Sequence, residues 1–320
     1  MESPLAQKIG LYGYIFTFPL GFIGHILSLV TFSSQTLRVT STGFLFICLT
    51  LSDIIYQLMS INDFIIQVLR VPTSKSVYLC RLRTFILNFL TFTSAWILVL
   101  ISMDRLIRVR FPHKQRQLCT PKLAALFVSI TCICSIIFTC HVLQSDFGFS
   151  DPVSPLCGPS RFALTFYSKF YFNIWPILQL FITYFIPNCL MIVSVICIRI
   201  SMNGQQIQFI RSRRREKNEQ QMFILMASSI ICFAICTLSY SIHRIVYQRF
   251  GVNLTTLIEI AILTVFLNIN YCYNFYIHCL TSKFFREKFI EQFERIFCGR
   301  KRQIINTSVH PLSLMTKPRN

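Results

Sequence analysis

Seven long apolar runs divide this chain of 320 residues. Each run reaches the roughly 20 residues that a helix needs to cross about 30 Å of hydrocarbon, because each helical residue rises about 1.5 Å. Hydrocarbon offers the backbone no hydrogen-bond partner, and the runs are too long for the strands of a membrane barrel. The sequence therefore predicts an all-α membrane protein, a bundle of seven transmembrane helices over residues 10–33, 43–69, 78–110, 122–143, 171–201, 220–247 and 254–279.

The positive charges orient this bundle. The net charge of +19 could suggest a nucleic-acid partner, but most of the 31 Lys and Arg residues fall on one side of the bundle if residues 1–9 lie outside the cell. Lys and Arg accumulate on the cytoplasmic side of membrane proteins, where they also attract anionic lipids. We therefore expect a multi-pass protein of the plasma membrane with a short extracellular N-terminus at residues 1–9, and no nucleic-acid binding.

Two of the 14 cysteines stand apart from the rest. Cys80 begins the third run, and Cys157 lies in the loop between the fourth and fifth runs. Both face the oxidising side in this orientation, where disulfides persist. A bridge between Cys80 and Cys157 would fix that loop over the mouth of the bundle.

The end of the third run carries a motif. Residues 102–112, SMDRLIRVRFP, resemble the Asp-Arg-Tyr region of rhodopsin-like G-protein-coupled receptors. Cys80 precedes Arg105 by 25 residues, which is similar to the family's interval between the disulfide cysteine and the switch arginine. Residues 49–53, LTLSD, are similar to the family's Leu-Ala-x-x-Asp pattern. The resemblance implies a divergent receptor that binds an extracellular ligand and activates a heterotrimeric G protein.

Other motifs of that family are altered. Phe275 and His278 stand where the seventh helix usually has proline and tyrosine, and Thr237 and Ser239 replace the tryptophan and proline of the sixth. Because proline is a usual cause of kinks, we expect a straighter sixth helix and atypical activation. A receptor-like protein with weakened signalling is one alternative. A membrane transporter or channel is another, although it predicts repeats and several intramembrane ionisable groups. No enzyme is expected, since no nucleophile motif or metal-ligand spacing is present.

The resemblance implies a switch at Arg105. An arginine keeps its charge at neutral pH and needs an anion in a low-dielectric bundle. Asp104 and Glu219 could supply that anion, and Glu219 falls where many family members carry the acid of the sixth helix. These three residues therefore form a predicted latch, which a G protein would open by giving Arg105 new partners.

A polar group lies deep in the predicted bundle. Asp53, Ser94, Asn270 and Asn274 occupy positions that resemble the family's sodium pocket. Oxygen ligands suit a hard cation, and one carboxylate neutralises a single charge. The alternative is a water-filled polar cluster. No other cofactor is expected.

The outer ends of the runs suggest the kind of ligand. Leu87 occupies the place where amine receptors carry an aspartate, so the resemblance argues against an amine ligand. The surrounding polar residues are mostly basic, which suits a peptide with acidic groups or a free C-terminus, or a small anionic ligand. We prefer a peptide; the alternative is that these side chains only reach for the membrane interface. The candidate ligand-binding residues are Asp63, Arg83, Leu87, Tyr240, His243 and Arg244.

The chain beyond the receptor domain, residues 10–281, has two parts. Residues 282–297 place Phe285, Phe289 and Phe293 on one face, which predicts a short amphipathic eighth helix on the inner leaflet of the lipid bilayer. Residues 298–320 are polar and are predicted to form a disordered cytoplasmic tail. Cys298, at its start, is a candidate for palmitoylation or a free thiol.

Overall fold

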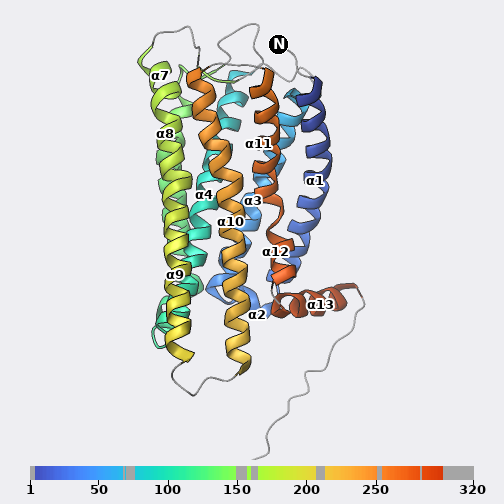
Figure 1. Cartoon of the computed structure of the whole chain (residues 1–320), viewed down its shortest axis with the longest axis vertical. Helices are drawn as coiled ribbons and strands as arrows, with labels where there is room; N and C mark the ends of the chain where they lie inside the picture. Colours follow the sequence, from blue (N-terminus) through green and yellow to red (C-terminus); the bar gives the residue numbers. More distant parts are fainter. Residues whose placement is uncertain are drawn as a thin grey trace, which may run out of the picture.

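The computed structural model describes residues 4–67, 69, 76–148, 157–159, 165–206, 213–250, 254–281 and 283–297. Long helices run side by side along one axis, and α13 lies across one end of the bundle (Figure 1). The elements are α1 (Pro4–Phe32), α2 (Gln35–Arg38), α3 (Ser41–Gln67), α4 (Val77–Arg110), α5 (Gln115–Leu118), α6 (Pro121–Thr139), η1 (Cys140–Leu143), α7 (Phe166–Lys169), η2 (Phe170–Ile174), α8 (Trp175–Gln179), η3 (Leu180–Phe185), α9 (Ile186–Gln206), α10 (Arg213–Phe250), α11 (Leu254–Cys272), α12 (Asn274–Thr281) and α13 (Lys283–Phe297).

The described helices confirm the predicted membrane bundle. Six are long and apolar enough to cross a membrane, and α11 with α12, bent by 57°, forms a seventh span. Large apolar side chains such as Ile133, Ile137 and Ile196 lie on the outside, more than half exposed. A continuous exposed apolar surface of this kind suits lipid and not water.

Local sequence explains where several helices begin. The hydroxyl of Thr120 accepts a hydrogen bond from the backbone N–H of Leu123, and Pro121 occupies the first turn of α6. Both features satisfy or remove N–H groups that have no partner inside a helix. α1 begins at Pro4 and not at residue 10, so most of the predicted N-terminal segment 1–9 is helical. Its first turns are more polar than the rest of the helix, so a search for apolar runs passes over them.

The sixth and seventh spans differ in continuity. α10 is unbroken, as expected without proline, and the hydroxyl of Thr237 bonds back to the carbonyl of Phe233. The seventh span bends at Tyr273 although Phe275 replaces the usual proline. The hydroxyl of Tyr273 donates to the carbonyl of Ser229 on α10, which anchors the bend to its neighbour.

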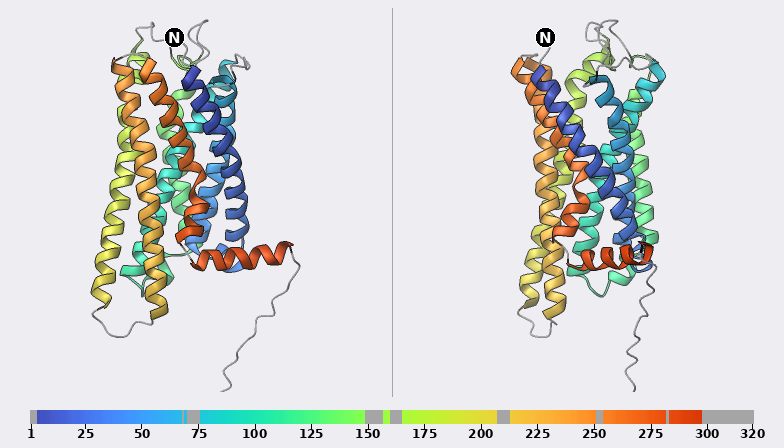
Figure 2. Two further views of the ribbon diagram at one scale, coloured as in Figure 1. Left: turned by 45° about the vertical axis from the view of Figure 1, so that its right-hand side comes forward. Right: turned by 90° about the vertical axis from the view of Figure 1, so that its right-hand side faces the viewer.

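α13 docks onto the bundle through aromatic side chains. The ring of Phe285 packs on Phe275 of α12 and Phe32 of α1, and it is almost completely buried. Phe289 packs on Phe275 as well, whereas Phe293 contacts Phe289 and remains partly exposed. The predicted apolar face of residues 282–297 is therefore what joins this helix to α1 and α12. Figure 2 shows α13 perpendicular to the bundle at the end opposite the N-terminus.

We call these two ends the α13 end and the disulfide end. The disulfide end carries the N-terminus and the bridge between Cys80 and Cys157. The described residues stop at Phe297, so the predicted tail 298–320, with Cys298, lies outside them.

Candidate functional site

Asp53 is the centre of a polar cluster midway along the bundle. It lies on α3 and is only 1% exposed. The hydroxyl of Ser94 on α4 donates to its Oδ1 at 3.2 Å, and Nδ2 of Asn274 on α12 donates to its Oδ2 at 2.9 Å. Asn270 lies one turn before Asn274 and accepts instead from the hydroxyl of Tyr273. Three of the four residues predicted from the sodium pocket are thus joined by direct hydrogen bonds.

The donor set of this cluster suits a single hard cation. Asp53 supplies the one negative charge, and Ser94 and Asn270 supply neutral oxygens nearby. Asn274 presents its N–H to Asp53, so its amide would have to turn before its oxygen could bind a cation. The geometry is equally suited to water, and sodium binding stays a prediction.

Asp104 at the α13 end is hydrogen-bonded to α3 and to Arg108. Its carboxylate accepts hydrogen bonds from the hydroxyls of Ser41 and Thr42 at the start of α3, and from Nε of Arg108 at 2.8 Å. Residues four apart share a helix face, whereas adjacent residues point in different directions. No hydrogen bond joins Asp104 to Arg105 among the described residues, so their pairing stays a prediction that rests on the proximity of the two charges.

Arg105 lies partly buried between helices, with its Nε enclosed. Its Nε has no hydrogen-bond partner among the described side chains. Glu219 lies on α10, but its side chain is outside the described part of the structure. The predicted partnership of Arg105 with Glu219 therefore stays a prediction. Two other basic residues connect the helices at this end: Arg110 donates to the hydroxyl of Ser201, and Arg199 lies over the ring of Phe223.

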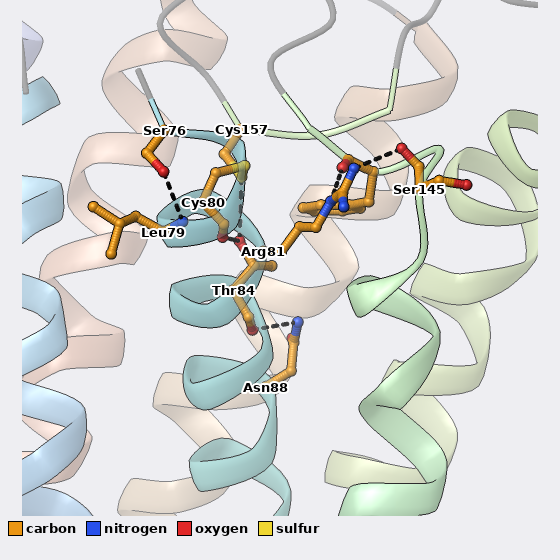
Figure 3. Close-up of a disulfide and its surroundings, with 9 residues drawn as sticks. Ser76, Leu79, Cys80, Arg81, Thr84, Asn88, Ser145 and Cys157 are labelled. Carbon is orange, nitrogen blue, oxygen red and sulfur yellow. Dashed lines mark hydrogen bonds between the residues drawn. A yellow bond between two sulfur atoms is a disulfide. The ribbon is translucent and has the colours of Figure 1, made fainter. Parts of the chain in front are cut away.

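The predicted disulfide is present at the other end. Cys80 and Cys157 are joined, with their Cα atoms 5.7 Å apart. Beside the bridge, Arg81 donates from Nε to the carbonyl of Phe147 and from Nη2 to that of Ser145 (Figure 3). These contacts hold the described parts of the loop, on both sides of its undescribed segment, against the first turn of α4.

A small pocket opens between the fifth and sixth spans, and its enclosed space is about that of one water molecule. Nη1 of Arg244 donates to Oε1 of Gln179 at 3.0 Å, and Nε2 of Gln179 donates to Oδ1 of Asn88 at 2.9 Å. The fifth span contains two π-helical segments, η2 and η3, on either side of the short helix α8. Each adds a residue to the turn and so shifts which side chains face inward. The lining residues are Pro176, Gln179, Leu180, Tyr184, Tyr240, Ser241 and Arg244.

Comparison with known families decides the identity. The model of the family described as the serpentine type 7TM GPCR chemoreceptor Srsx matches residues 18–293. The chain belongs to the Srsx family. This match runs from the middle of α1 through the other six spans and most of α13, and it agrees with the Asp-Arg motif, the disulfide and the bundle described above.

Receptors of other animals are similar to this Srsx-family chain over most of their length. A probable G-protein coupled receptor of Caenorhabditis elegans is 21% identical, over 90% of this chain and 71% of its own. The RYamide receptor of Tribolium castaneum is 23% identical over 94% and 84%, respectively. Galanin receptor 2a of Danio rerio is 23% identical over 90% and 78%. These relatives are receptors and not enzymes, and the chain is a divergent rhodopsin-like receptor.

The candidate ligand-binding residues of this Srsx-family chain fall into separate groups. Tyr240 and Arg244 line the pocket, and Leu87 packs beside Tyr240 in an apolar cluster next to it. His243 faces away and contacts Glu259 of α11 at 2.8 Å. Arg83 is mostly buried on α4 and does not line the pocket. The side chain of Asp63 lies outside the described part of the structure.

Sequence reasoning missed Gln179, Asn88 and Tyr184. Gln179 and Asn88 are amides inside apolar spans, and a polar side chain at membrane depth is expected to face the protein interior. That signal was available for both amides. Tyr184 carries no such signal, because its inward position depends on the π-helical segment η3.

Proposed function

We propose that this chain is a plasma-membrane receptor that binds an extracellular ligand at the disulfide end and activates a heterotrimeric G protein at the α13 end. In this orientation the N-terminus lies outside the cell and α13 lies along the inner leaflet. The distribution of Lys and Arg supports the orientation, since the basic first turn of α10 and the helix α13 lie at the α13 end.

One observation carries the proposal. A single rigid helix, α4, bears Cys80 at its outer start and Arg105 near its inner end. The disulfide ties Cys157 to one end of this helix, and the other end presents a partly buried arginine whose Nε has no partner among the described residues. A ligand that binds one conformation more tightly can therefore shift the other end through α4 and its neighbours.

A peptide is the preferred ligand. Two of the relatives are named as the RYamide receptor and galanin receptor 2a, which supports a peptide. The enclosed space of the pocket is about that of one water molecule, far below the roughly 300–1,000 Å³ of most small-molecule sites, so it would hold only the end group of a longer ligand. A small anionic ligand is the second candidate, and the pocket with Arg244 favours it.

Sodium binding at Asp53 belongs to the same proposal. A cation beside Asp53 would bridge α3, α4 and α12 and would favour one arrangement of these spans. Agonist affinity measured in membranes should then differ between sodium and a bulky organic cation. The variant Asp53→Asn should remove that difference.

Ligand-induced signalling tests the main proposal. Cells that express the chain with a promiscuous G protein are screened with peptide and small-molecule libraries, alongside cells that express Arg105→Ala. A dose-dependent response that Arg105→Ala abolishes at equal surface expression supports the proposal. Surface-expressed receptor that responds to no ligand, and flux of an ion or solute after reconstitution, would favour a transporter instead.

A further inference from the structure

Arg244 is a cation held by neutral partners. Its Nη1 donates to Oε1 of Gln179, and the hydroxyl of Tyr171 on η2 bonds to its side chain as well. Gln179 is oriented in turn by Asn88, whose Nδ2 donates to the carbonyl of Thr84. The chain of amides fixes the oxygen of Gln179 on Arg244 but supplies no negative charge.

The positive charge of Arg244 is not balanced by a described carboxylate. Among the described residues its hydrogen-bond partners are an amide and a phenol. Glu259, on the neighbouring α11, is engaged with His243. A guanidinium has five N–H donors, and burying a cation without an anion is costly. Within the described part of the chain, this partly buried guanidinium therefore has no hydrogen-bonded carboxylate.

The pocket beside Arg244 has the form of an end-group site. Tyr184 and Tyr240 provide aromatic walls, and Arg244 provides the charged side. The planar guanidinium fork matches a carboxylate in a bidentate geometry. The enclosed space is about that of one water molecule, so a carboxylate head can enter while the apolar group that bears it lies at the open mouth of the pocket.

We propose that this pocket is a carboxylate subsite, in which Arg244 binds an acidic group of the ligand while Tyr184 and Tyr240 contact the adjoining apolar part. The inference rests on the proposed receptor function and names the ligand chemistry of its site. The carboxylate can come from the C-terminus or an acidic side chain of a peptide, or from a small organic acid.

Thermal unfolding of the purified full chain tests the subsite with matched probes. Phenylacetate and phenylacetamide share the same benzyl group, but the first carries a carboxylate and the second a neutral amide. At about ten times its dissociation constant, phenylacetate should raise the Tm of the wild type by about 2 °C, and phenylacetamide should not. Arg244→Gln should lose this shift, while Arg244→Lys should retain part of it. Equal shifts by acid and amide would overturn the subsite.

An internal carboxylate gives a test that needs no ligand. Gln179→Glu places an anion against Arg244, and the amide of Asn88 can turn to donate its N–H to the new side chain. The Tm should rise by about 3 °C in the presence of Arg244 and should fall in the Arg244→Gln background. The same effect in both backgrounds would overturn the subsite. If Arg244→Gln does not fold, the single variant Gln179→Glu decides the question. A higher Tm together with loss of the phenylacetate shift supports the subsite. An unchanged Tm with the shift retained overturns it.

Cellular responses separate this inference from the proposed function and distinguish the ligand sources. The G-protein response of the wild type is measured with peptides that have a free C-terminus, with the same peptides amidated at the C-terminus, and with small organic acids. Thermal shifts with no G-protein response to any of them leave the subsite standing and contradict the receptor function. A response to amidated and acidic ligands that Arg244→Gln leaves unchanged supports the receptor and overturns the subsite.

Discussion

The carboxylate of Asp104 accepts the Nε proton of Arg108 at 2.8 Å, one helical turn along α4. The same carboxylate accepts from Ser41 and Thr42 at the start of α3. This acid therefore ties α4 to α3 and leaves its neighbour Arg105 available to other helices. Within the Asp-Arg motif, Asp104 therefore has structural contacts, and the proposed switch role falls to Arg105.

Asp104→Asn tests the structural role of this acid. Asparagine keeps the shape but cannot form the ion pair, and a buried hydrogen bond to a charged group contributes about 1.5–3 kcal/mol. We expect the free energy of unfolding to fall by about 2 kcal/mol, measured as a lower Tm in detergent. The same change at the exposed Asp146 should have little effect. Equal losses at both positions would contradict the role given to Asp104.

Glu219→Ala tests the remaining half of the predicted latch. If Glu219 on α10 restrains Arg105, its removal should raise G-protein activation in cells without ligand, because the restrained state loses its anion. We expect basal activity to rise several-fold at equal surface expression. Glu287→Ala, on the exposed side of α13, serves as the control. An unchanged basal signal would count against a latch between α4 and α10.

The sequence predicted the features that depend on long-range hydrophobic pattern. The seven spans follow from apolar length, and α13 follows from the spacing of Phe285, Phe289 and Phe293. The disulfide between Cys80 and Cys157 follows from topology, because both must lie on the same side. These features are predicted correctly even when the ends of the predicted helices are wrong by several residues.

The features that it did not predict depend on local geometry. Asp104 bonds to Arg108 because residues four apart on a helix point to the same side, and the sequence pattern alone does not reveal this pairing. The pairing of Gln179 with Arg244 depends on two π-helical segments, which shift the inward face away from a 3.6-residue count. The bend at Tyr273 occurs without proline, so no breaking residue marks it.

Phe275 in the usual proline place has a packing role. Its ring is buried against Phe285 and Phe289 of α13. Truncation of a buried phenylalanine costs about 3–5 kcal/mol, so Phe275→Ala should loosen α13 from the bundle. Hydrogen exchange of residues 283–297 should become faster by at least about tenfold. Phe293→Ala, at the partly exposed end of the same aromatic row, should change it little.

Cys119 reports both the local environment and the orientation of the chain. It lies between α5 and α6 at the α13 end, and burial together with the nearby carboxylate of Asp104 raises the pKa of its thiol to about 11. The thiolate is the reactive form, so little of it exists at neutral pH. Alkylation of Cys119 should therefore be slow at pH 7 and should accelerate about tenfold with each pH unit until the pKa is approached.

The same cysteine distinguishes the two sides of the membrane. A membrane-impermeant maleimide, followed by site-resolved mass spectrometry, should modify Cys119 in inside-out vesicles and spare it in intact cells. Cys119→Ser removes the signal and identifies it among the other free cysteines. Modification in intact cells would place the α13 end outside, and then Arg105 could not meet a cytoplasmic G protein.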